Sequence, residues 1–276
     1  YVGGDGMDYI MDIAVDDDGF AYVVGSTSSA RFFPIHVDAQ QSQRGGGSDV
    51  FFAKFNPSGR LWYSTYLGGS QNDFGTAITL DADKNIYIGG YTASYNFPIL
   101  FGTGGVAGGV DMFIAKYDSG GRMNFSRTYG GASNDVISRG GLAVDEIGRV
   151  YVAGKTNSPF SFEHPIAGAR GEGVLIRFSA GGQSVEFSTP LGDNAADIKV
   201  GEDCTTYATG SISQNGFPTI TPLPQGSSLK GRRDAFVGSV ESSCGCAQMP
   251  QVQPCQIPRC DEGLGSWIID LLPTGS

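Results

Sequence analysis

The chain has 276 residues, of which 40% are hydrophobic and 17% are charged, so it can bury the core of one large all-β domain or of two smaller domains. A net charge of −10 would repel a phosphate backbone, which excludes nucleic acid from the expected partners. No stretch reaches the ~18 consecutive apolar residues that a membrane-spanning helix needs. The 43 glycines follow no collagen-like period and indicate many short strands joined by tight turns.

A unit of about 62 residues recurs four times along the chain, which indicates a repeat architecture. Each copy contains a tyrosine followed three residues later by glycine, and an aromatic–proline pair that becomes His164-Pro165 in the third copy. A glycine precedes an aspartate by five residues in every copy, and these aspartates are Asp8, Asp73, Asp135 and Asp197. An acidic residue opens an apolar run at intervals of 62, 61 and 62 residues, at Asp49, Asp111, Glu172 and Asp234.

Four strand-like segments follow one another in each copy. The first copy has Asp49–Phe55 as its third strand, and the second copy has Thr76–Leu80, Asn85–Tyr91, Asp111–Tyr117 and Met123–Tyr129. Four antiparallel strands make a propeller blade, and blades stacked about one axis bury the faces that a single blade would expose. The sequence therefore predicts an all-β β-propeller of four-stranded antiparallel blades over residues 1–240, followed by a Cys/Pro-rich C-terminal tail over residues 241–276.

Short polar segments between the strands suit tight hairpin turns, in which Asp, Asn and Gly tolerate a left-handed backbone. The first two copies have Asp16-Asp17-Asp18-Gly19 and Asp81-Ala82-Asp83-Lys84 at this place. Carboxylates at alternating positions suit calcium, which makes Asp16, Asp18, Asp81 and Asp83 its candidate ligands. The glutamate that closes an EF-hand loop is missing, so we interpret these segments as plain turns.

Several motifs of the first copy resemble the bacterial SBBP-type beta-propeller repeat, a family whose name suggests seven blades. They are Gly-Gly-x-x-x-Asp at the start, then Ile13–Asp16, Tyr22–Ser28, Phe33-Pro34 and Asp49–Phe55. The resemblance covers about residues 1 to 240 and implies an extracytoplasmic propeller with no shared catalytic residues. Four copies leave open a closed four-bladed ring, an arc of a larger propeller, or a ring completed by a partner.

The fourth copy stops after its third strand, Asp234–Val240, where the other copies continue into a fourth. The N-terminal residues 1–4 match the end of a fourth strand and would complete this sheet by closing the ring. Alternatively, a strand from elsewhere fills the place, because an unpaired edge is a template for another strand. The tail offers residues 267–272 for this role, and we expect Trp267 and Leu271 to be buried.

All five cysteines lie in the last quarter of the chain, at Cys204, Cys244, Cys246, Cys255 and Cys260. A cluster of cysteines in a Pro/Gln-rich tail is typical of disulfides formed in an oxidising compartment, and the spacing fits no familiar zinc ribbon. We predict disulfides, with Cys244 or Cys246 as the partner of Cys204. Because five is odd, one thiol stays free or pairs with another chain.

Catalytic chemistry finds little support in the sequence. The chain has two histidines, His36 and His164, and the second replaces the aromatic residue of a repeat motif. Aspartates that recur once per copy, such as Asp8, are expected to accept hydrogen bonds from turn amides where blades meet. We therefore predict no catalytic residue and, apart from calcium, no cofactor.

These observations favour a non-enzymatic extracellular or cell-surface module with a structural or adhesive role, which binds other protein subunits and assembles through its tail or an open blade edge. The segment between the proline of the aromatic–proline pair and the acidic residue that opens the third strand varies from 6 to 15 residues, and variable loops on a rigid scaffold carry binding specificity. The alternative is a glycan-binding propeller or a carbohydrate-active enzyme that uses the central opening. A lectin of this kind needs exposed aromatic residues in every blade, and an enzyme needs clustered carboxylates in unequal environments.

Overall fold

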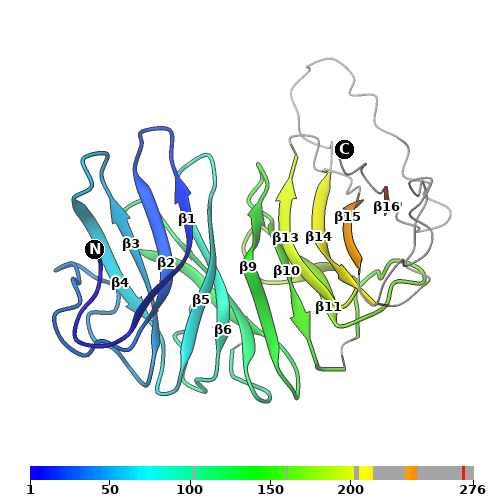
Figure 1. Ribbon diagram of the computed structural model, residues 1–276, viewed down its shortest axis with the longest axis horizontal. Coiled ribbons are helices and arrows are strands. Elements are labelled where there is room, and N and C mark those ends of the chain that lie inside the picture. The colour runs from blue at the N-terminus through cyan, green and yellow to red at the C-terminus, as the bar shows by residue number, and fades with distance from the viewer. Residues whose placement is uncertain (102–103, 160, 202–204, 214–233, 241–268, 271–276) are drawn as a thin grey trace.

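A computed structural model of the chain contains four antiparallel sheets of four strands each, which follow one another in chain order (Figure 1). It describes all residues except 102–103, 160, 202–204, 214–233, 241–268 and 271–276. The described residues form strands, turns and loops without a helix, so the predicted all-β class is confirmed. In the same residues nothing meets the length and apolarity of a helix that crosses a bilayer.

The strands have the following bounds. The first sheet contains β1 (Asp8–Val15), β2 (Ala21–Thr27), β3 (Asp49–Phe55) and β4 (Leu61–Leu67), and the second contains β5 (Asp73–Leu80), β6 (Ile86–Thr92), β7 (Asp111–Tyr117) and β8 (Met123–Tyr129). The third contains β9 (Asp135–Val144), β10 (Val150–Thr156), β11 (Gly173–Phe178) and β12 (Val185–Pro190). The fourth contains β13 (Asn194–Val200), β14 (Thr206–Ile212), β15 (Asp234–Val240) and β16 (Ile269–Asp270).

We call the first strand of each sheet its inner strand and the fourth its outer strand. A β-bulge interrupts the pairing of the inner strand with the second strand in every sheet. It falls between Ile10 and Asp12 in β1, and between Gly75 and Ala77 in β5. Side chains near the bulges bond to the inner strand of the next sheet: Asp12 Oδ2 accepts the Ile78 amide hydrogen at 2.9 Å. The hydroxyls of Thr76 and Ser138 donate to backbone carbonyls of the third and fourth sheets at 2.9 and 2.6 Å. The bulges therefore aim polar groups across the gap between neighbouring sheets.

Three buried hydrophobic clusters lie between successive sheets, and a fourth, with Phe33, Phe51 and Tyr66, lies on the outward side of the first sheet. Between the first and second sheets, for example, Tyr22 and Phe52 pack in one buried cluster with Ile78 and Phe113. Equivalent layers join the second sheet to the third and the third to the fourth. The second and third sheets thus bury both of their faces against neighbouring sheets, which is the arrangement of propeller blades.

The blades form an open arc. In Figure 1 the inner strands β1, β5, β9 and β13 lie in a central row, and the first and fourth sheets extend from this row to opposite sides of the molecule. Of the three arrangements expected from the sequence, the closed four-bladed ring is therefore not the one that the structure shows.

The fourth sheet takes its last strand from the tail. Backbone pairing places Ile269 of β16 opposite Val240 of β15, and Asp270 opposite Ser239. The N-terminal residues lie instead beside the first sheet, where the Asp5 amide donates to the Arg31 carbonyl at 3.1 Å. The tail, rather than the N-terminal stub, thus occupies the fourth place. The rest of the predicted tail domain, including Trp267 and Leu271, lies outside the described residues.

Loops between the second and third strands run along the outer strand of their own sheet. The His36 amide donates to the Ser64 carbonyl of β4 at 3.2 Å, and Leu100 forms an isolated bridge with Ser126 of β8. In the third sheet the Ser188 amide donates to the Glu163 carbonyl at 2.7 Å. These loops cover outer strand edges that would otherwise be templates for another chain. The open-edge assembly predicted from the sequence therefore finds its edges partly occupied in the first three sheets.

Candidate functional site

The aspartates that begin the inner strands hold the blades together from within. The Asp73 carboxylate accepts hydrogen bonds from the Thr92 hydroxyl, from the Ser94 hydroxyl at 2.9 Å and from the Gly69 amide at 2.8 Å. Burial raises the pKa of Asp73 above its ordinary value, although these three donors oppose the shift. Asp8 and Asp135 accept the same set of bonds from their own sheets. These carboxylates have a structural role, because each joins the start of an inner strand to the end of the strand beside it.

Asp197 does not belong to this set. It pairs with Thr209 in the middle of β13, and its Oδ1 accepts the amide hydrogen of Ile198, the next residue. By strand register, Asp193 is the residue of the fourth sheet that corresponds to Asp73. Asp193 comes two residues after Leu191. Asp73 comes six residues after Leu67, which is the equivalent of Leu191. The loop before the inner strand is thus four residues shorter in the fourth copy. The prediction of Asp197 from the glycine-to-aspartate spacing was therefore wrong, because the residue at the position of Asp73 is Asp193.

The hairpin acids that suit calcium use their oxygens within the turns. Asp16 Oδ1 accepts the amide hydrogens of Asp18 and Phe20, and its Oδ2 accepts the Tyr22 hydroxyl at 2.9 Å. Partial burial acts to raise the pKa of Asp16, but these donors outweigh it and hold that pKa below its ordinary value. Asp18 itself pairs with the Lys84 ammonium.

The second hairpin repeats this pattern around Asp81. Its Oδ1 accepts the amide hydrogens of Asp83 and Asn85, and its Oδ2 accepts the Tyr87 hydroxyl at 3.1 Å. Asp145 does the same in the third sheet, a site that the sequence did not single out. Among the described residues no three acidic, histidine or cysteine side chains gather as a metal site would require. The arrangement is that of Asx turns.

The cysteines contribute nothing to the described geometry. Cys204, Cys244, Cys246, Cys255 and Cys260 all lie outside the described residues. Their predicted disulfides, and the pairing of Cys204 with the tail, stay predictions.

An apolar surface lies on the outward side of the first sheet, and we call it the open blade face; it consists of Ile10, Ile13 and Val15. Their exposed fractions are 54%, 58% and 63%. In the next sheets, residues at the position of Ile13 are buried against the preceding sheet: Ile78 is 5% exposed and Ile198 is 1% exposed. The open blade face is therefore the surface that a preceding sheet covers everywhere else in the arc.

The fit at this surface is close where a preceding sheet is present. Gly75 occupies the position of Ile10, and a Cβ atom there would come within 2.6 Å of Val24 and 2.9 Å of Val50 in the first sheet. Glycine is therefore the residue that the contact between the first two sheets permits. No such contact limits Ile10, whose larger side chain extends from the open blade face.

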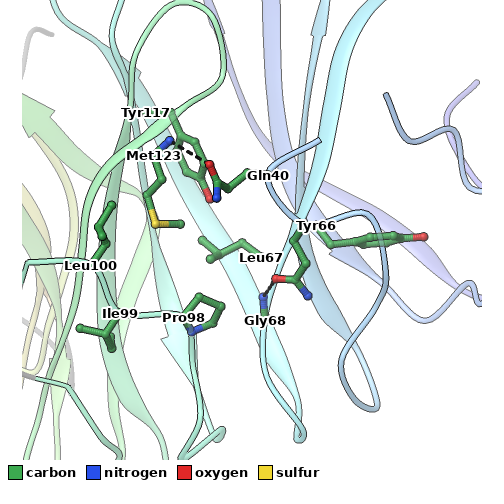
Figure 2. Close-up of a pocket in the computed structure, with 10 residues that line it drawn as sticks. Gln40, Tyr66, Leu67, Gly68, Pro98, Ile99, Leu100, Tyr117 and Met123 are labelled. Carbon is green, nitrogen blue, oxygen red and sulfur yellow. Dashed lines mark hydrogen bonds between the residues drawn. The ribbon is translucent and has the colours of Figure 1, made fainter. Parts of the chain in front are cut away.

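A cavity of about 420 Å³ lies between the first and second sheets. Figure 2 shows the residues that line it. Its wall is largely apolar, with Leu67, Ile99, Leu100 and Met123, and Gln41 closes one side by accepting the Gly68 amide hydrogen at 3.1 Å. Tyr117 is fully buried beside it, and its hydroxyl has no hydrogen-bond partner. The cavity wall is largely apolar, and no carboxylate is among its lining residues.

Comparison with known proteins agrees with this architecture. The family profile described as SBBP beta-propeller repeat matches residues 1–33, 63–98 and 125–161. The chain is also similar to the regulatory protein FlaEY of Caulobacter vibrioides, with 26% identity over 132 residues. That alignment covers 46% of this chain and 14% of FlaEY.

Stacked four-stranded blades define the chain as a β-propeller repeat protein. Three segments within its first three sheets match the SBBP beta-propeller repeat profile. The first matched segment begins before β1, the other two begin within the outer strands β4 and β8, and all three end near the aromatic–proline pair, so the match follows the structural repeat. The expected family is confirmed, whereas the number of blades in a complete ring is not given by the match.

Proposed function

We propose that this chain is a non-enzymatic protein-interaction module, with a structural or adhesive role outside the cytoplasm, and that the open blade face is its binding surface. The observation that carries this proposal is the difference between Ile13, which is 58% exposed, and its buried equivalents in the other three sheets. Burying an apolar side chain of this size contributes about 1.5–3 kcal/mol. The face therefore favours a partner that covers it.

The partner that fits is another sheet of the same repeat type. In the arc, each such position packs on a preceding sheet that presents residues like Tyr22, Val24 and Phe52. A purified chain without that partner is expected to cover the face with a second copy of itself. Apolar surfaces that monomers would leave exposed are typical of interaction sites.

A non-enzymatic role is supported by the way the polar groups are used. The recurring aspartates and the hairpin acids accept hydrogen bonds from their own sheets. His36 Nδ1 accepts the Asp38 amide hydrogen at 3.2 Å, and the His36 ring packs on Tyr63 with centroids 5.5 Å apart. The extracellular location is supported by the clustered cysteines of the sequence.

Light scattering over a range of protein concentrations tests the binding surface. We expect the wild-type chain to associate as its concentration rises, and the double variant Ile10→Glu, Ile13→Glu to stay at the monomer mass, because each new carboxylate would lose its hydration at the interface. Ile147→Glu is the matched control, since Ile147 is 65% exposed in a turn away from this face. A wild-type chain that stays monomeric, or association that survives the double substitution, would refute the proposal.

A further inference from the structure

A second hollow, of about 540 Å³, opens where β4 begins, beside the turn that joins β7 to β8. Its wall combines an indole ring, a guanidinium and a carboxylate, supplied by Trp62, Arg60 and Asp38. Arg60 and Asp38 are exposed, and no ion pair between described residues engages either of them. The hollow is therefore open to solvent and chemically mixed, unlike the apolar cavity of Figure 2.

The tryptophan of this hollow is not required by the blade. Trp62 is 58% exposed, and the equivalent positions of the second and third sheets carry Asn124 and Glu186. The next residue, Tyr63, points inward and is buried, as a strand alternation requires. The blade therefore does not need an aromatic ring at this position, and the exposed indole is available for contact with a ligand.

The loop backbone and the indole ring that line the hollow are held in place by the rest of the blade. The loop that carries Asp38 is fixed to β4 by the His36 amide and by the Gln40 amide, which donates to the Tyr63 hydroxyl at 3.1 Å. The edge of Trp62 is supported by Phe20, with ring centroids 5.9 Å apart at 81°. Preorganised groups lose little conformational entropy on binding, which favours recognition of a small ligand.

We propose that this hollow binds a pyranose ring of a glycan. The apolar C–H face of the sugar stacks on the Trp62 ring, and its hydroxyls donate to the Asp38 carboxylate and accept from the Arg60 guanidinium. A flat aromatic side chain beside a few fixed polar groups is the usual composition of a small-molecule site, and Trp combines apolar area with a polar edge. The site lies at the rim of one blade junction, so it differs from a lectin with an aromatic residue in every blade.

The test uses the fluorescence of Trp62. The chain has two tryptophans, so Trp267→Phe leaves Trp62 as the single indole emitter. We expect cellotetraose, chitotetraose or mannotetraose to change its emission saturably, while glycerol at the same mass concentration does not. Trp62→Asn, which copies the second sheet, is expected to abolish binding measured by calorimetry while the circular dichroism spectrum stays the same.

Polar contacts are tested by Asp38→Asn and Arg60→Gln, each of which we expect to weaken binding about tenfold, as the loss of one charge-assisted hydrogen bond would. Ile147→Asn is the surface control. The proposal is overturned if none of the three sugars changes the Trp62 emission, or if Trp62→Asn binds them as tightly as the wild type. No residue of the open blade face lines this hollow. The double variant Ile10→Glu, Ile13→Glu should therefore bind sugar normally, whatever light scattering shows about its association.

Discussion

Two buried tyrosines of the second sheet use their hydroxyls differently. Tyr87 donates to Asp81 Oδ2 at 3.1 Å, and the same bond recurs in the first and third sheets. Tyr117 is fully buried beside the cavity of Figure 2, and its hydroxyl has no partner. The positions equivalent to Tyr117 carry Phe55 and Phe178, so the blade does not need the hydroxyl.

We therefore predict that Tyr117→Phe raises the free energy of unfolding by about 1 kcal/mol, because a buried hydroxyl without a partner is destabilising. Tyr87→Phe is the matched control and should lower it by about 1–2 kcal/mol, because the variant loses a bond to a carboxylate. Urea denaturation followed by circular dichroism measures both. Equal effects of the same sign would contradict this account of the two hydroxyls.

Asp49 adds a dependence of stability on pH. Burial, together with the nearby Asp73 carboxylate, raises the pKa of Asp49 to about 6, although the Gly45 amide donates to it at 2.7 Å. The folded chain thus holds this proton more tightly than the unfolded chain, whose Asp titrates near its ordinary value. The free energy of unfolding should fall as pH rises from about 4 to about 6, by up to about 3 kcal/mol from this group.

Comparing the wild type with Asp49→Asn checks this prediction, because the amide does not titrate. Denaturation at several pH values between about 4 and 7 should show the wild type losing stability relative to the variant as pH rises. Parallel pH profiles would show that Asp49 keeps an ordinary pKa in the folded chain.

At the scale of elements, one carboxylate joins the start of each inner strand to its neighbour in three of the four sheets. Asp73→Asn should therefore lower the free energy of unfolding by about 2–3 kcal/mol, because its amide group cannot accept the full set of three bonds. Asp197→Asn should change it by less than about 0.5 kcal/mol, because Asp197 is half exposed and, among the described residues, contacts the next amide and, weakly, Lys199. Chemical denaturation of the two variants under one condition distinguishes these roles. Similar losses would restore Asp197 to the repeating set.

Most elements could be predicted from the sequence because the repeat fixes their order. β7 and β8 have the predicted bounds, and β5 begins at Asp73, three residues earlier than expected, because Asp73 already pairs with Thr92. The spacing of the motif predicted the wrong aspartate in the fourth copy, because the loop before its inner strand is shorter there. A tail strand beside β15 was one of two interpretations, and backbone pairing selects it.

The candidate surfaces were harder to predict than the strands. Ile13 and Ile78 occupy the same place in their repeats, and nothing in either motif tells which one a neighbouring sheet covers. Trp62 stands in a strand of ordinary pattern, and comparing it with Asn124 and Glu186 was the one available signal. A repeat predicts what its copies share, whereas binding surfaces depend on where the copies differ or where the stacking ends.

At the scale of the whole molecule, equivalent faces are buried in one blade junction after another, and the corresponding residues of the first sheet are exposed. Three buried clusters join the four sheets, whereas a fourth cluster, around Phe33 and Phe51, covers part of the outward side of the first sheet and leaves Ile10, Ile13 and Val15 exposed. Stability in such stacked repeats depends on contacts between neighbours. An added sheet on this face should therefore stabilise the arc as well as bind it.

Thiol labelling at equivalent positions of two blades tests this claim most directly. The variants Ile13→Cys and Ile78→Cys are each treated with N-ethylmaleimide under native conditions at low protein concentration. Peptide mass spectrometry then measures the label at each introduced cysteine separately from the native cysteines. We expect the thiol at position 13 to react as fast as a free thiol, and the thiol at position 78, whose native side chain is 5% exposed, to react only through opening of the blade junction. Equal protection at both positions, or equal reactivity at both, would contradict the open arc of stacked blades.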